Sequence, residues 1–163
     1  MSDPLPSPAP GAGANPAVAW ADPRREQAFN EWLARVAPAH GLDPATVQPA
    51  SADASFRRYL RVDGSRGTRI VMDAPPDKED CRPFVHVARL MADAGLHVPR
   101  VLEWDEPQGF MLLDDLGRRT MIEVVDAAQP AASRPLYLRA VDALLAWQQA
   151  SRPGVLPAYD EAL

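Results

Sequence analysis

The stretch Gly109-Phe110-Met111-Leu112-Leu113-Asp114-Asp115-Leu116-Gly117 divides this chain into two unlike parts. Its four apolar residues are bounded by turn-forming residues, which is the pattern of a short buried β-strand. Two carboxylates and a glycine follow and indicate that the chain leaves the sheet there. Before this stretch the pattern predicts a sheet with helices, and after it only helix. We therefore predict a hinge at 114–119 between two lobes, the second of which is only begun in this sequence.

Composition limits the class of protein. The 163 residues carry a formal charge of −5, which argues against a non-specific nucleic-acid binder. The one cysteine, Cys81, cannot form an internal disulfide, and this favours a reducing compartment. No segment approaches the ~18 apolar residues of a membrane span, and the N-terminus lacks the regions of a signal peptide. We expect a soluble, cytoplasmic protein with no nucleic-acid or membrane partner.

The N-terminal part predicts a tail followed by a helix. Residues 1–21 are rich in proline and alanine and hold too little apolar bulk to offset the entropy of ordering them, so we expect a disordered tail. Asp22-Pro23 is a good helix start, and Pro38 and Gly41 are expected to stop that helix. Its apolar stripe, at helical spacing, is Phe29, Trp32, Leu33 and Val36.

The middle of the chain predicts strands and one further helix. A strand at 46–48 leads through small turn residues at 51–55 into a strand at 56–62. In that strand Phe56, Leu60 and Val62 share one face, and Arg57, Tyr59 and Arg61 take the other. The other expected elements are a strand at 68–72, a helix ending near Gly95, a strand at 98–104 and an antiparallel partner at 110–113.

The pattern beyond the hinge is helical. Residues 120–125 fit no single element, 129–133 indicate a loop, and Ser133 is expected to cap a helix. The apolar stripe of that helix is Leu136 or Tyr137, Ala140, Val141, Leu144 and Trp147. The fold class is therefore α+β: a small antiparallel sheet with one packed helix and a leading helix in residues 22–113, then the hinge, then the start of a second lobe at 120–163.

Four motifs, in this order, resemble a known family: Ser51 to Tyr59, Val71 to Pro76, Ala94 to Val101 and Leu112 to Gly117. The set is similar to the N-terminal lobe of aminoglycoside-phosphotransferase-like kinases, which have a protein-kinase-like fold. Within them it resembles the bacterial anomeric kinases of N-acetylmuramate and N-acetylglucosamine used in cell-wall sugar recycling. The resemblance extends from Glu26 to the C-terminus.

The resemblance implies an ATP site between two lobes, with Mg²⁺ as the metal and an amino sugar as the phosphate acceptor. The turn from Ser51 to Phe56 would cover the phosphates, although Ala52 stands where a glycine is expected. The hinge would bind adenine through the Asp114 carbonyl and the Leu116 amide. The nucleotide-binding positions implied are Ser51, Asp53, Ser55, Phe56, Arg57, Met72, Asp114, Asp115 and Leu116.

Two departures from the family pattern affect the chemistry. The position of the usual β-strand lysine holds Met72 or Asp73, and the following helix offers Phe84 or a neighbour instead of the usual glutamate. The phosphates would then be held by other cations: Arg57, Arg58 or Lys78. None of His40, His86 and His97 begins a His-x-Asp catalytic loop. We therefore predict that the catalytic residues and metal ligands lie in a missing C-terminal lobe, and that this chain alone is inert.

Simpler interpretations remain open for the same residues. Residues 51–55 also fit an ordinary hairpin turn, and Asp114-Asp115 a solvated turn. Arg57, Arg58 and above all Arg61 fit a solvated strand face. For function, the alternatives are another small-molecule phosphotransferase, acting on an aminoglycoside, choline or a homoserine-like alcohol, and a non-catalytic nucleotide-binding module.

Overall fold

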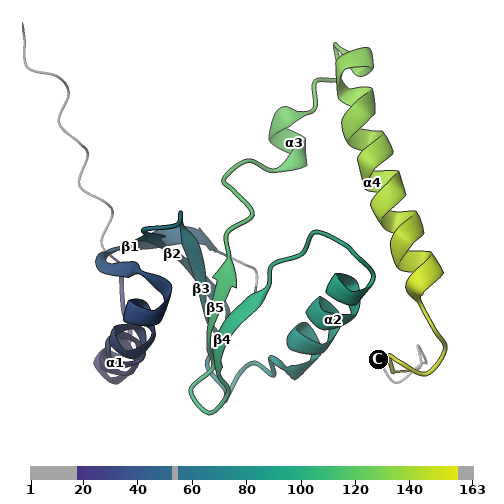
Figure 1. Ribbon diagram of the computed structural model, residues 1–163. Helices are drawn as coiled ribbons and strands as arrows, with labels where there is room; N and C mark the ends of the chain where they lie inside the picture. Colours follow the sequence, from purple (N-terminus) through teal and green to yellow (C-terminus); the bar gives the residue numbers. More distant parts are fainter. Residues whose placement is uncertain (1–17, 53–54, 158–163) are drawn as a thin grey trace, which may run out of the picture.

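The computed structural model of the protein describes residues 18–52 and 55–157. A five-stranded antiparallel sheet lies between two helices, α1 on one face and α2 on the other, and two further helices follow it (Figure 1). The elements in chain order are α1 (Pro23–His40), β1 (Leu42–Ala52), β2 (Arg58–Gly64), β3 (Arg69–Asp73), α2 (Arg82–Asp93), β4 (Val101–Asp105), β5 (Phe110–Asp114), α3 (Met121–Val124) and α4 (Pro130–Ala150). The predicted α+β class is confirmed.

The leading helix α1 begins as its sequence predicts. The Asp22 carboxylate accepts a hydrogen bond from the Arg24 amide at 2.9 Å, and Pro23 occupies the first turn. At the other end the helix continues through Pro38 and stops at Gly41, whose φ of +64° suits a residue without a Cβ. Pro38 was expected to help stop the helix, but a proline so close to the end removes few of the helix's backbone hydrogen bonds.

The sheet has the strand order β1-β2-β3-β5-β4, and every neighbouring pair is antiparallel. Leu60, Val71 and Leu112 lie abreast on β2, β3 and β5, and all three are buried on the face that α1 covers. One step along these strands Tyr59, Met72 and Met111 lie abreast on the α2 face. The sheet is therefore buried on both sides, since successive side chains point to opposite faces.

Each face has its own apolar core. The core under α1 is formed by Phe29, Trp32, Leu33, Leu60, Val62, Val71, Phe110 and Leu112. The core under α2 is formed by Met72, Ala74, Cys81, Val85, Met111 and Leu113. Three of the four residues in the predicted stripe of α1 are thus fully buried, and Val36 packs at the edge of the same core.

Some sequence predictions differ from the structure. Phe56 was expected in the strand beside Leu60, but it precedes β2 and its side chain is 62% exposed. β1 extends to Ala52, so Ser51 lies in a strand and not in the turn. Trp20, assigned to the tail, packs on Phe29 with 5.0 Å between ring centroids.

The part that follows the hinge stands away from the sheet in Figure 1. α4 begins at Pro130, so the prediction that Ser133 caps this helix is wrong. Ser133 is buried in the first turn and its Oγ accepts a hydrogen bond from the Asp126 amide at 3.1 Å, which makes it a connection between the helix and the loop before it. Among the residues that the structure describes, no helix has both the length and the apolar character needed to cross a membrane.

Candidate functional site

A cavity of about 390 Å³ lies where the sheet passes into the predicted hinge, residues 114–119, and we name it the hinge cavity. It is lined by the end of β1, by three sheet strands, by α2 and the loop after it, and by the hinge itself. The lining residues are Ala50, Ser51, Tyr59, Arg61, Ile70, Phe84, Pro99, Leu113, Asp114, Asp115, Leu116, Gly117, Arg118 and Thr120.

Sheet register explains how these residues meet. Ser51 on β1 lies opposite Tyr59 on β2, and Ile70 on β3 lies opposite both Arg61 and Leu113. All these β2, β3 and β5 residues belong to the face that α2 covers only in part. The uncovered part of that face, at the hinge end, is the hinge cavity.

Asp115 fixes the hinge to the sheet. Its carboxylate accepts hydrogen bonds from Arg61 Nε at 2.5 Å, from Thr68 Oγ1 at 2.6 Å and from the Gly117 amide at 2.9 Å. The side chains of Asp115 and Arg61 are only 5% and 8% exposed. The Arg61 guanidinium is the main reason that the pKa of Asp115 lies well below its usual range, and the Thr68 and Gly117 donors add to that effect. The carboxylate is therefore ionised and fully engaged.

This pair overturns one sequence interpretation. Arg61 was expected on a solvated strand face, yet it is buried and bound to Asp115 and to the Gly117 carbonyl. The alternation of β2 correctly placed Arg61 on the other face of the sheet from Leu60 and Val62. What the alternation could not show is that the hinge, far along the chain, covers that second face.

Asp114 has a different environment from its neighbour. Its carboxylate accepts from Arg100 Nε at 2.6 Å, and this bond is the main reason that the pKa of Asp114 is lowered. The Asp114 amide donates to the Arg100 carbonyl at 3.1 Å. The Leu116 amide, in contrast, has no acceptor among the described residues. Leu116 thus lines the cavity with a backbone N–H that no described residue accepts, while both hinge carboxylates are occupied.

The segment that leads into β2 is held by one carboxylate. Glu79, in the loop before α2, accepts from the Phe56 amide at 3.1 Å and from Arg57 Nε at 3.0 Å. Partial burial lowers the pKa of Arg57, but hydrogen bonds to Glu79 and Tyr59 outweigh that effect and raise it. The Ser55 hydroxyl accepts from the Arg57 amide at 3.2 Å. Asp53, the remaining predicted site residue of this segment, lies outside the described residues.

The two residues at the usual lysine position do not reach the hinge cavity. Met72 is fully buried in the core under α2, beside Met111. Asp73 points to the opposite face, where it is buried between Arg25 and Arg58. Of the implied nucleotide-binding residues, Ser51, Asp114, Asp115 and Leu116 line the hinge cavity. Ser55, Phe56, Arg57 and Met72 do not line it.

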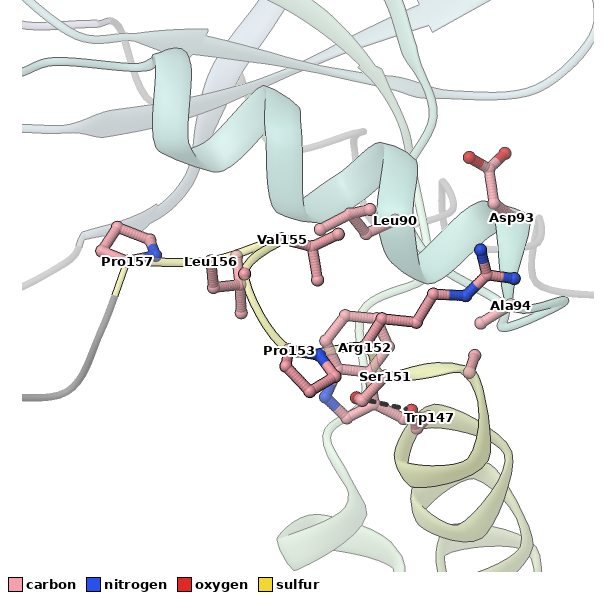
Figure 2. Close-up of a pocket in the computed structure, with 12 residues that line it drawn as sticks. Leu90, Asp93, Ala94, Trp147, Ser151, Arg152, Pro153, Val155, Leu156 and Pro157 are labelled. Atoms are coloured by element: carbon pink, nitrogen blue, oxygen red, sulfur yellow. Dashed lines mark hydrogen bonds between the residues drawn. The ribbon is translucent and has the colours of Figure 1, made fainter.

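A larger cavity, of about 560 Å³, lies between the end of α2 and the segment after α4. Figure 2 shows that its walls are mainly apolar, with Leu90, Val155 and Leu156 on one side and Trp147 on the other. His86 Nε2, from α2, lies 2.9 Å from the Val155 carbonyl oxygen and connects α2 with the segment after α4. We place the candidate site at the hinge cavity because polar groups from several elements converge there.

Comparison with known proteins gives a consistent result. A family model described as phosphotransferase enzyme family matches residues 46–163. The chain is 50% identical over 149 residues to an N-acetylmuramate/N-acetylglucosamine kinase of Pseudomonas aeruginosa. The aligned region covers 87% of this chain and 43% of that protein. Kinases of the same name from Pseudomonas putida and Neisseria meningitidis serogroup B are each 40% identical, over 88% and 84% of this chain and 40% of their own lengths. The chain therefore spans about two fifths of the curated relatives that it matches.

Proposed function

The chain belongs to the phosphotransferase enzyme family, and on that premise we propose that it is the N-terminal lobe of an ATP-dependent sugar kinase. The complete protein would transfer the γ-phosphate of ATP to the anomeric hydroxyl of N-acetylmuramate or N-acetylglucosamine, with Mg²⁺. The choice of acceptor is supported by the names of relatives that are 40–50% identical. The single cysteine of the sequence supports a cytoplasmic location.

The hinge cavity is the observation that carries this proposal. Adenine would enter it with the Leu116 amide as hydrogen-bond donor and the Asp114 carbonyl as acceptor. Ile70, Leu113 and Phe84 supply apolar walls for the ring. The Arg61–Asp115 pair keeps the hinge backbone in place, so the two adenine-binding groups are positioned before the nucleotide arrives.

The phosphates would extend from the hinge cavity past Ser51 toward Ser55, Phe56 and Arg57. The Ser51 hydroxyl and the Arg57 guanidinium are donors suited to phosphate oxygens. Mg²⁺ would neutralise charge on the transferring group. The described residues hold no group of three or more His, Cys, Asp or Glu side chains able to bind a metal ion, so the ligands are expected elsewhere in the complete protein.

The proposal is tested with the complete natural protein that carries this sequence. Purified protein, ATP and Mg²⁺ are incubated with N-acetylmuramate, N-acetylglucosamine, an aminoglycoside, choline or homoserine, and sugar phosphate and ADP are measured. We expect ADP release with the two N-acetyl amino sugars only. Phosphorylation of another acceptor alone would reject the sugar assignment, and nucleotide binding without transfer to any acceptor would indicate a binding module.

The 163-residue chain by itself is the negative control for that assay. We expect it to form no sugar phosphate, because positioning of the acceptor hydroxyl and metal binding supply most of the rate of phosphoryl transfer. Phosphorylation of N-acetylmuramate by this chain alone would show that the proposed division between two lobes is wrong.

A further inference from the structure

Glu79 holds two groups of the segment that leads into β2. One carboxylate oxygen accepts from the Phe56 amide and the other from Arg57 Nε, at 3.1 and 3.0 Å. The Glu79 side chain is 12% exposed and that of Arg57 27%, so the pair is screened from solvent more than a surface ion pair is. Because Nε carries the bond to Glu79, the plane of the guanidinium is fixed while its two terminal nitrogens take no part in that bond.

The position of Arg57 relates it to the hinge cavity. Arg61 and Tyr59 line that cavity from β2, and Arg57 directly precedes the first residue of that strand. Since Arg61 binds the hinge residue Asp115, Arg57 lies at the end of β2 that is far from the hinge. It lines a neighbouring cavity of about 400 Å³ that shares Phe84 and Pro99 with the hinge cavity. A nucleotide with its base at the hinge would direct its phosphates toward this end.

The other two candidate cations are less suited to that place. Arg58 lies on the opposite face, with its guanidinium bound to Asp73 and to the Ala19 carbonyl and stacked on Trp20. Lys78 lies with its ammonium 5.0 Å from the centre of the exposed Phe56 ring, and lines neither the hinge cavity nor the neighbouring one. Arg57 alone of the three is both held by a partner and on the hinge-cavity side of the sheet.

We propose that Arg57 binds the phosphates of the nucleotide and that Glu79 is the positioning residue that holds it, so that this pair takes the place of the missing strand lysine and helix glutamate. The inference rests on the proposed function, since it assumes a nucleotide with its base at the hinge. The two residues come from other places than in the usual arrangement. The cation comes from the residue before β2, and the carboxylate comes from the loop before α2.

The test compares binding of ATP and adenosine by the complete natural protein, using isothermal titration calorimetry. The variants are Arg57→Gln, Glu79→Gln and the double variant. We expect ATP to bind about tenfold more weakly to each single variant, because a charge-assisted hydrogen bond to phosphate is lost or loosened. Adenosine, which has no phosphate, is expected to bind within about twofold of wild type. The double variant is expected to bind ATP no more weakly than Arg57→Gln alone.

The Arg82–Glu106 pair supplies matched controls. It is a nearby ion pair with an Nε–carboxylate distance of 2.6 Å, but it is exposed and lines neither the hinge cavity nor the neighbouring one. Arg82→Gln and Glu106→Gln are expected to leave both affinities unchanged. Equal ATP affinity in wild type and Arg57→Gln, or parallel loss of ATP and adenosine binding, would overturn the inference. If the wild type binds neither ligand, the proposed nucleotide site itself is rejected. If the wild type binds ATP normally and the variants bind it equally well, only the role of Arg57 and Glu79 is rejected.

Discussion

Asp115 and Asp114 are adjacent and chemically identical, yet their environments give them different roles. Asp115 is buried and binds the buried Arg61, whereas Asp114 binds Arg100, whose side chain is largely exposed. Removing one partner of a buried pair leaves an uncompensated charge in a poorly solvated place, which is costly. An exposed pair gains little, because water and salt screen it. The two residues therefore allow a direct comparison.

We predict that Asp115→Asn lowers the free energy of unfolding by about 3 kcal/mol, since it leaves Arg61 without its carboxylate. Asp114→Asn, the matched control one residue away, is expected to cost less than about 1 kcal/mol. Urea denaturation followed by circular dichroism measures both. Equal effects at the two positions would contradict the assignment of Asp115 as the residue that fixes the hinge.

The same pair makes stability depend on pH. Because the pKa of Asp115 is lowered in the folded state, its contribution is complete above the ordinary aspartate value of ~3.9 and declines as the pH falls below it. Asparagine does not titrate. We therefore expect the difference in stability between wild type and Asp115→Asn to be constant from pH 7 to about pH 5 and to narrow below about pH 4. Urea titrations at several pH values check this, and a constant difference down to pH 3 would contradict it.

Gly109 is the residue of the β4–β5 connection that no other amino acid fits. Its φ is +70°, and a Cβ there would overlap the carbonyl oxygen of Ala74, whose amide donates to Gly109 at 2.9 Å. We predict that Gly109→Ala costs about 3 kcal/mol of unfolding free energy. Gly95→Ala is the control, since Gly95 has a φ of +77° but open space around it, and we expect about 1 kcal/mol there. Similar denaturation midpoints for the two variants would disprove the steric argument.

At the scale of elements, α1 is part of the lobe and not an appendage. Phe29 and Trp32 pack against Phe110 of β5, with ring centroids 5.7 and 5.5 Å away. Arg25 extends from the same helix to Asp73 and lies over the Phe110 ring at 3.9 Å. The helix therefore closes one face of the sheet with an apolar core and an ion pair at its edge.

We predict that Trp32→Ala destabilises the lobe by about 3–5 kcal/mol, because it leaves a cavity between α1 and the sheet. Asn30→Ala, on the exposed side of the same helix, is expected to change stability by less than about 0.5 kcal/mol. Thermal unfolding of both variants separates loss of packing from a change in helix propensity. A small loss of stability in Trp32→Ala would show that the packing of α1 contributes little to the stability of the sheet.

At the scale of the whole molecule, α4 has an apolar face that the described residues leave largely uncovered. Its apolar side chains are about half exposed: Tyr137, Leu138, Val141, Leu144 and Leu145. Such a continuous apolar face is a typical interaction surface. The chain spans about two fifths of the length of its curated relatives, so each relative contains a further segment that has no counterpart here.

We predict that the 163-residue chain alone self-associates through α4. Val141→Gln with Leu144→Gln is expected to reduce association without changing the unfolding of the sheet. Ile122→Gln, which removes an exposed apolar residue of α3, serves as the control and is expected to have little effect. Sedimentation velocity measures association. A chain that stays monomeric at every concentration would rule out self-association through the apolar face of α4.

Much of the first lobe could be predicted from local pattern. Asp22-Pro23 and Gly41 delimit α1, and the apolar run 110–113 became the buried strand β5, because caps, turns and alternation act between residues close in sequence. The four ordered motifs correctly indicated the phosphotransferase family. Phe56 was misplaced because alternation says nothing about where a strand begins. Ser133 was misplaced because a serine near a helix start fits a cap or a first-turn residue equally well.

The sequence by itself determined the order of the helices and strands up to β5 and the family. Only the tertiary structure decided which charges meet. Arg57, Arg58 and Arg61 are alike in sequence, yet they bind Glu79, Asp73 and Asp115 respectively. Arg61 and Asp115 lie 54 residues apart, and no local rule relates them. The physical reason is that an ion pair depends on the distance between two side chains after folding, which sheet register and the packing of both faces set together.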